Sequence, residues 1–192
     1  MLTEALYLLT ILSIIIFLIY ASFYLIFLSY SWLKGAPYVA TEHDDIADAL
    51  AQAQFRKGDY LIDLGCGDGR ILRYAAKKYH IHGMGIDINP LLILVARIRT
   101  WVSGLKDIEY RRANILDCDL SKANVIYLYL LPRFIQMIKH QLVQATHNHT
   151  LIISHAFCIP YLEKHLIQQR KGTVFTTYYY QIIDAKQPHI SV

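Results

Sequence analysis

The segment DYLIDLGCGDGRILRYAAKKYHIHGMGIDINP, residues 59–90, decides the fold of this chain. An apolar run at 60–64 predicts a buried strand, and a turn with three glycines follows it. Apolar residues then recur at helical spacing over 71–79, and a second apolar run at 81–86 ends on Asp87. This order predicts an α/β fold with a mostly parallel sheet, whose ligand binds at the carboxyl ends of the strands.

The glycine spacing in this turn distinguishes between two kinds of ligand. A dinucleotide-binding turn has the pattern G-x-G-x-x-G, and counting from Gly65 its third glycine position falls on Arg70. Because an arginine there obstructs the close packing of helix on strand, NAD is disfavoured. The pattern present is D-x-G-x-G-x-G, from Asp63 to Gly69, and it resembles the first motif of the class I S-adenosylmethionine-dependent methyltransferases.

This resemblance implies S-adenosylmethionine as the cofactor, a molecule whose amino acid end carries an ammonium and a carboxylate. We expect Asp63 to meet the ammonium and the glycine amides to approach the carboxylate. Asp87, at the end of the second strand, can accept hydrogen bonds from both ribose hydroxyls. The alternative is a plain tight turn, with Asp87 as an acid at the start of a helix.

The resemblance also implies an acid or amide after the third strand, predicted at 108–112, that recognises the adenine amino group. Asn114 suits this role, because its carbonyl can accept from the exocyclic amine and its NH2 can donate to a ring nitrogen. Asp117 is the nearby alternative, and an ordinary turn asparagine is the other interpretation. The predicted cofactor-binding residues are Asp63, Gly65, Cys66, Gly67, Gly69, Asp87, Ile88, Asn114 and Ile115.

The N-terminal segment differs from the rest of the 192-residue chain, which has room for one domain and an appendage. Between Glu4 and Lys34 lie 29 consecutive residues without a charge. As a helix they extend about 44 Å, against a hydrocarbon core of about 30 Å. The first four residues, MLTE, contain no basic residue, which disfavours a signal peptide. We predict a transmembrane anchor at 1–34 and a methyltransferase domain at 35–192; the alternative is a buried helix of a soluble fold.

Two observations predict the orientation of the anchor. Lys34, its only flanking cation, lies on the C-terminal side, which favours a cytoplasmic catalytic domain. S-adenosylmethionine is made in the cytosol, which favours the same orientation. Tyr7 at one end, and Tyr30 with Trp32 at the other, suit the two membrane interfaces. The predicted localisation is a single-pass membrane protein, and the net charge of +4 suits either an anionic leaflet or RNA.

The cysteines and histidines do not indicate a metal site. The three cysteines have no C-x-x-C spacing, and the nine histidines are dispersed. His80 with His82, and His147 with His149, are spaced to share one side of a strand, but no third ligand accompanies them. We therefore predict no metal.

Caps and periodicity predict the elements on either side of the glycine-rich turn. Thr41 and Asp44 read as a capping box, and residues 37–41 either cross the open end of the cofactor cleft or form a plain linker. The helix after this box is expected to face inward with Ile46, Ala47, Leu50 and Ala51. Asn89 and Pro90 start another helix. Its predicted inward residues are Leu91, Leu94, Val95 and Ile98.

The C-terminal third supplies the other half of the sheet. Apolar strands are predicted at 124–131 and at 150–154, the latter ending at His155, with a helix at 132–145 between them. An antiparallel hairpin turning at Gly172 is favoured over a helix at 161–169. The inward residues of the predicted helix are Phe134, Ile135, Ile138, Leu142 and Val143.

Four motifs, APYVAT, DLGCGDGR, GIDINP and YLYLLP, extend the resemblance over about residues 35–184. The chain is similar to the small membrane-anchored methyltransferases that modify lysines of the ATP synthase c subunit and of the adenine nucleotide translocase, as a prokaryotic-type relative. The resemblance implies a seven-stranded fold, S-adenosylmethionine as methyl donor, and protein lysine as acceptor in the animal members. Members of this family commonly have an acidic residue after the proline of the YLYLLP motif, whereas this chain has Arg133. The fold by itself does not identify the substrate.

Tyr129, at the end of the fourth predicted strand, is the expected catalytic residue. Methyl transfer is an in-line displacement that depends on alignment, and the Tyr129 hydroxyl or a neighbouring carbonyl can accept a hydrogen from an acceptor amine. The alternative is that Tyr129 only fills the cleft wall. Tyr127 is expected on the other face of the sheet, in the core.

Three functional hypotheses follow. The favoured one is a membrane-anchored methyltransferase acting on a protein lysine, with the bilayer and a protein substrate as partners. The second is a methyltransferase for a lipid or another small membrane-associated substrate, and the third is a non-catalytic S-adenosylmethionine-binding adaptor. No nucleic acid partner is expected, because no stripe of stacked aromatic and basic residues is visible.

Overall fold

The computed structural model describes residues 2–33, 43–147, 150–172 and 174–181, in two compact units, Met1–Val39 and Ala40–Val192. The first unit contains helix α1 (Leu2–Leu33). Within it, Thr3–Ser22 is long and apolar enough to cross a membrane by length and composition, a test that a signal sequence or a core helix also passes. The side chains from Thr3 to Tyr20 are exposed, as they would be in a lipid-facing span.

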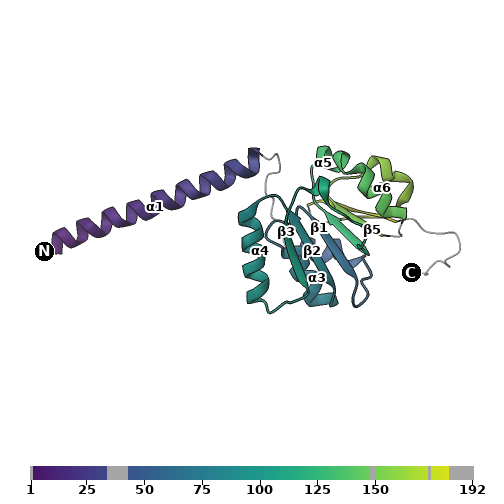
Figure 1. Ribbon diagram of the computed structural model, residues 1–192, viewed down its shortest axis with the longest axis horizontal. Helices are drawn as coiled ribbons and strands as arrows, with labels where there is room; N and C mark the ends of the chain where they lie inside the picture. Colours follow the sequence, from purple (N-terminus) through teal and green to yellow (C-terminus); the bar gives the residue numbers. More distant parts are fainter. Residues whose placement is uncertain (1, 34–42, 148–149, 173, 182–192) are drawn as a thin grey trace. The chain divides into compact units, whose positions relative to one another are not determined.

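The second unit is built on a seven-stranded sheet in the order β3-β2-β1-β4-β5-β7-β6 (Figure 1). The first five strands along the chain are parallel, whereas β7 is antiparallel to both β5 and β6. This confirms the predicted mostly parallel sheet with an antiparallel C-terminal hairpin. The strands are β1 (Tyr60–Leu64), β2 (His82–Asp87), β3 (Ile108–Arg112), β4 (Val125–Leu128), β5 (Leu151–His155), β6 (Leu166–Lys171) and β7 (Thr176–Tyr180).

Two apolar layers enclose the sheet. Side chains of α2 (His43–Ala51), α3 (Arg70–Tyr79) and α4 (Pro90–Val102) share one core cluster with one face of the strands. On the opposite face, α5 (Pro132–Met137), α6 (Lys139–His147) and the 3₁₀ helix η2 (Pro160–His165) form the second cluster. Both faces of the parallel strands are therefore buried, as continuous apolar strands require.

Local signals fix where the helices nearest the site begin. The Asn89 side chain accepts hydrogen bonds from the N–H groups of Leu91 and Leu92, at 3.0 and 3.4 Å, and Pro90 is the first residue of α4. The predicted cap is confirmed. It starts α4 immediately beyond Asp87, so that the acid lies at the carboxyl edge of the sheet.

The predicted inward face of α4 is wrong. Leu94, Val95 and Ile98 are exposed, and Leu91 is only partly buried. The buried residues of α4 are Leu92, Ile93, Ala96 and Thr100. Because apolar residues occur on both sides of this helix, their spacing fits either face, and the small Ala96 side chain allows the close approach to the sheet that Ile98 would prevent.

Other expectations need smaller corrections. Ala51 of α2 is exposed, while Ile46, Ala49 and Leu50 are buried; Thr41 and the side chain of Asp44 lie outside the described residues. The helix predicted at 132–145 divides into α5 and α6 at the buried Ile138. Phe134 and Val143 are partly buried, and β4 is shorter than predicted.

Candidate functional site

The glycine-rich turn joins β1 to α3 at the carboxyl edge of the sheet. Gly65, Gly67 and Gly69 all have positive φ angles, of 77°, 54° and 75°, which residues with side chains rarely adopt. The N–H groups of Gly65 and Cys66 both donate to the carbonyl of Ile86, at 2.8 and 3.0 Å. The turn is therefore held against β2, and its glycines also leave room for the side chains of Leu130 beside Gly65 and Tyr110 beside Gly69.

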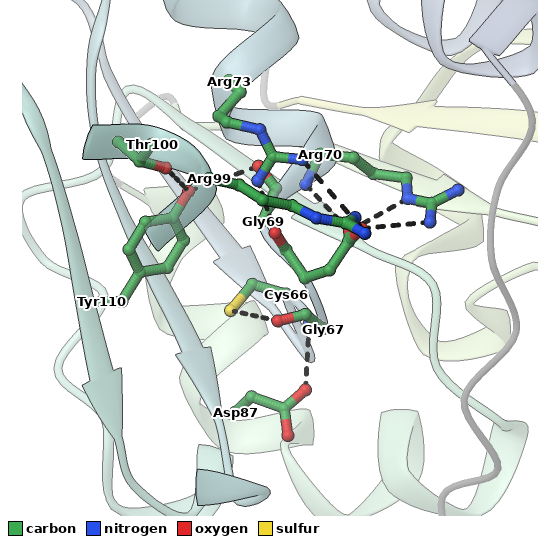
Figure 2. A network of polar contacts seen from close by, with 10 residues as sticks. Cys66, Gly67, Gly69, Arg70, Arg73, Asp87, Arg99, Thr100 and Tyr110 are labelled. Carbon is green, nitrogen blue, oxygen red and sulfur yellow. Dashed lines mark hydrogen bonds and ion pairs between the residues drawn. The ribbon is translucent and has the colours of Figure 1, made fainter. Parts of the chain in front are cut away.

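Asp87 connects the turn to the start of α4 (Figure 2). Its Oδ2 accepts from the N–H of Gly67 at 3.0 Å, and its Oδ1 accepts from the N–H of Asn89 at 2.8 Å. Burial raises the pKa of this carboxyl, and the backbone N–H groups of Asn89, Gly67 and Ile88 counteract part of the rise. A carboxylate has about four acceptor positions, so these backbone bonds orient Asp87 and leave capacity for the predicted contact with ribose hydroxyls.

Asp63 is a buried carboxyl with one oxygen that lacks a hydrogen-bond partner in the described part of the chain. It is 2% exposed, and its Oδ2 has no hydrogen-bond partner among the residues that the structure describes. Burial, then the charges of Asp87 and Asp68, raise the pKa of this carboxyl well above its usual value. An unpaired buried carboxylate is costly and is satisfied by a cation, so this position fits the ammonium of S-adenosylmethionine.

Gly85 is a part of the site that the sequence analysis missed. It lies opposite Asp63 in the pairing of β1 with β2. A Cβ atom there would approach Tyr110 Cδ1 to 2.7 Å and Cys66 Sγ to 2.8 Å. The absent side chain thus allows Tyr110 and Cys66 to pack behind the turn. Burial raises the pKa of the Cys66 thiol well above its usual value, which keeps it protonated and favours a packing role.

Three arginines surround Asp68 behind the turn, where Figure 2 shows Arg70, Arg73 and Arg99 converging. Arg70 binds the carboxylate with two nitrogens, at 3.0 and 3.1 Å, Arg99 pairs with it from α4, and Arg73 donates to the Asp68 carbonyl. Burial alone would raise the pKa of Asp68, but the Arg70 hydrogen bond and the three positive charges lower it overall. Asp68 therefore connects the start of α3 to α4 across the back of the site.

Asn114 follows β3 on the same edge of the sheet. It is the N-cap of the 3₁₀ helix η1 (Ile115–Asp117), and its Oδ1 accepts from the N–H of Leu116 at 3.2 Å. Asn114 is exposed, and the residue before it, Ala113, donates its N–H to the Asp87 carbonyl at 3.1 Å. The cap occupies one acceptor position of Asn114, so its NH2 group is the more available for adenine. Asp117 is also exposed.

Tyr129 lies in an aromatic cluster beyond the end of β4. Its ring centroid is 5.0 Å from that of His155, 6.4 Å from that of Phe157 and 5.8 Å from that of Phe175. His155 Nδ1 is 3.0 Å from Thr177 Oγ1, which fixes the imidazole in the cluster. Tyr127 is buried as predicted but also packs against His155, at 6.4 Å. The prediction that it lies on the other face is wrong, because residues two apart on a strand share a face.

The structure thus places all the predicted site residues along one edge. Asp63 lies near the end of β1, and Gly65, Cys66, Gly67 and Gly69 follow that strand. Asp87 ends β2 and Ile88 follows it, Asn114 and Ile115 follow β3, and Tyr129 follows β4. Their roles stay predictions. The partners of Tyr129 were missed because they are distant in sequence, and no local pattern connects them to β4. His155 ends β5, Phe157 follows that strand, and Phe175 immediately precedes β7. In the described part of the chain, no group of His, Cys, Asp and Glu is arranged to hold a metal ion.

This fold and this site define a class I, S-adenosylmethionine-dependent methyltransferase. The sequence family described as the ANTKMT methyltransferase domain matches residues 63–166, more than half of the chain. The chain belongs to this family. The predicted family, enzyme class and cofactor are confirmed.

Individual relatives agree with this assignment. A protein-lysine N-methyltransferase of Saccharolobus islandicus is 32% identical over 158 residues, which are 80% of this chain and 97% of that protein. The adenine nucleotide translocase lysine N-methyltransferase of Mus musculus is 27% identical over 65% of this chain, which spans 54% of the mouse enzyme. The crystal structure of an RNA methyltransferase from Salinibacter ruber, in complex with S-adenosyl-L-homocysteine, superposes with a TM-score of 0.71 at 29% identity, covering 80% of this chain and all of that one.

Proposed function

We propose that this protein is a membrane-anchored methyltransferase that modifies a lysine of a membrane protein or of a protein close to the membrane. The observation that carries the proposal is the aromatic cluster around Tyr129, at the edge where Asp63, Asp87 and the glycine turn lie. Relatives described as lysine methyltransferases, in Saccharolobus islandicus and in Mus musculus, support the same acceptor.

The cluster supports a lysine acceptor because of what a lysine needs before it can react. With a reference pKa of about 10.4, removing its proton at pH 7 costs about 4.6 kcal/mol. A desolvating aromatic wall disfavours the ammonium and so lowers that cost. Phe157 and Phe175 supply apolar rings, and the Tyr129 hydroxyl supplies an acceptor for an amine hydrogen.

The donor and the acceptor have separate places in this proposal. When bound, S-adenosylmethionine supplies a methyl group activated by a sulfonium, so no metal is required. Asp63 and Asp87 hold its ammonium and ribose, and Asn114 and Ile115 contact its adenine. Tyr129 and the rings around it orient the incoming nitrogen, and the protein's main contribution is alignment.

Membrane anchoring is proposed on α1, whose uncharged sequence is long enough to span the hydrocarbon core. The single flanking cation, Lys34, favours a cytoplasmic catalytic domain. A span would keep the enzyme among membrane proteins, which agrees with a substrate of that kind.

The test is a labelling experiment that sorts acceptors by class. Membranes containing the full chain are incubated with tritiated S-adenosylmethionine and extracted into protein, lipid and RNA fractions, with Asp87→Ala as the inactive control. We expect label in protein, recovered as methyl-lysine after hydrolysis and absent with Asp87→Ala.

RNA is the competing acceptor, because the Salinibacter ruber structure is described as an RNA methyltransferase. Lipid is the other. Label confined to the RNA or lipid fraction would reject the lysine proposal, and the absence of any turnover would support a non-catalytic adaptor instead.

A further inference from the structure

The outer face of α4 is apolar and lacks a protein partner in the described part of the chain. Leu94, Ile98, Trp101 and Val102 are 52%, 51%, 81% and 72% exposed. Their spacing places them on one stripe along the helix, opposite the buried residues that face the sheet. A helix that is apolar on both sides is normally covered on both sides, so this stripe indicates a second contact surface.

The same region carries an excess of positive charge, within which Arg99 pairs with Asp68 and Arg111 pairs with Glu109 at 3.6 Å. Residues 90–112 contain five basic residues and two acidic ones, a balance of +3 within a chain of net charge +4. Helix α4 itself has no acid. Arg111 and Arg112 are exposed on β3, the edge strand against which α4 packs. An apolar stripe with a tryptophan and neighbouring cations is the pattern of a helix that lies at an anionic membrane surface.

A groove extends this surface between α4 and the edge strand. It has a volume of about 500 Å³, and its lining includes Trp101, Leu105, Ile108 and the arginines Arg97 and Arg111. Arg97 is fixed there by donating to the carbonyl of Tyr110 at 2.7 Å. Glu109 also lines the groove and pairs with Arg111 at 3.6 Å, so Arg97 is its guanidinium without an acid partner among the lining residues. The groove thus combines apolar walls with guanidinium groups, which suits the acyl chain and phosphate of a lipid.

We propose that the outer face of α4 and this groove bind the anionic leaflet of the membrane. This inference rests on the anchoring part of the proposed function, and it adds a second contact that the catalytic unit makes itself. A second copy of the chain is a poorer partner for this face. A symmetric dimer would bring two copies of residues 90–112 together, each with more basic than acidic side chains, and these would repel each other. An anionic leaflet offers the opposite charge and an apolar interior at once.

The two tryptophans of the chain, Trp32 in α1 and Trp101 in α4, allow a direct test. The full chain with Trp32→Phe, which leaves Trp101 as the only tryptophan, is reconstituted into vesicles of phosphatidylglycerol and brominated phosphatidylcholine. We expect a blue shift of Trp101 emission and loss of most of its intensity through quenching by bromine. Vesicles of brominated phosphatidylcholine alone should quench less.

Matched variants assign the contact to the stripe. Leu94→Ser with Ile98→Ser should restore much of the emission, whereas Met137→Ser, which changes an exposed apolar residue of α5, should not.

Extraction with alkaline carbonate reports separately whether α1 is inserted in the membrane. Retained insertion with unquenched Trp101 overturns this inference and leaves the anchor intact. A blue shift that depends on protein density and not on bromine also overturns it, because it indicates a second copy. Failure of insertion rejects the anchor itself.

Discussion

Asp63 is the residue at which we expect binding and folding to have opposite requirements. Its carboxyl is buried beside Asp87 and Asp68, with one oxygen that no described residue pairs. We expect Asp63→Asn to weaken S-adenosylmethionine binding about 10- to 100-fold, the range for losing a hydrogen bond to a charged group. The same change should raise the free energy of unfolding of the ligand-free protein by about 1 kcal/mol, because an amide does not ionise and so avoids the cost of burying a carboxyl whose pKa is raised on folding. Calorimetry and urea unfolding measure the two effects.

The pH dependence of Asp63→Asn has a definite sign. A carboxyl whose pKa is raised on folding contributes stability that is fully present below its unfolded pKa, about 3.9, and lost as the pH rises through the folded pKa. The stability advantage of the variant should therefore grow between about pH 4 and neutrality. A constant difference across that range would show that Asp63 does not titrate with a raised pKa.

Tyr129→Phe tests the proposed acceptor site without removing its aromatic wall. The variant keeps the ring contacts with His155 and Phe175 and loses only the hydroxyl. We expect turnover to fall about 100-fold, the lower end of the range for a positioned acid or base, with unchanged affinity for S-adenosylmethionine. Single-turnover kinetics with calorimetry separate the two. Unchanged turnover would leave Tyr129 as a wall residue.

At the scale of elements, Asp68 joins α3 to α4 through its three arginines. Asp68→Asn should lower the free energy of unfolding by about 1–3 kcal/mol, because the charge-assisted bonds to Arg70 and Arg99 are lost. Since the pKa of Asp68 is lowered on folding, this contribution is present above about pH 3.9 and is lost as the pH falls through the folded pKa. The gap between variant and natural protein should close in acid, as measured by urea unfolding.

Asp107→Asn is the matched control for this change. Asp107 is also an aspartate paired with a basic residue, but both it and His82 are largely exposed. Exposed pairs contribute little, so its effect should stay below about 1 kcal/mol. Equal losses for the two variants would contradict the role given to Asp68.

Local signals predict some elements well and others poorly. The turn after β1, the Asn89 cap and the acid ending β2 each depend on neighbours in sequence, so glycine spacing and capping chemistry were sufficient to predict them. The inward face of α4 was mispredicted because apolar residues surround the helix. The break at Ile138 and the cluster around Tyr129 depend on packing between distant segments, which no periodicity reports.

At the scale of the whole molecule, the second compact unit, Ala40–Val192, should fold without α1. The Saccharolobus islandicus relative and the Salinibacter ruber structure match over 97% and 100% of their own lengths while leaving a fifth of this chain unmatched. We expect removal of residues 1–33 to leave the affinity for S-adenosylmethionine within about twofold, because every predicted site residue lies in the compact unit Ala40–Val192. Calorimetry measures this, and lost affinity in a folded truncated protein would contradict it.

The direction of α4 has a consequence for which lysines can be reached. In a strand, helix, strand unit the helix runs roughly antiparallel to the strands, so α4 leads away from the edge where Asp87 and the glycine turn lie. With α4 flat on the leaflet, that edge would open sideways, along the surface of the bilayer. The enzyme would then select its targets by height, accepting lysines at the level of the lipid headgroups and passing over those on domains that project further into solution.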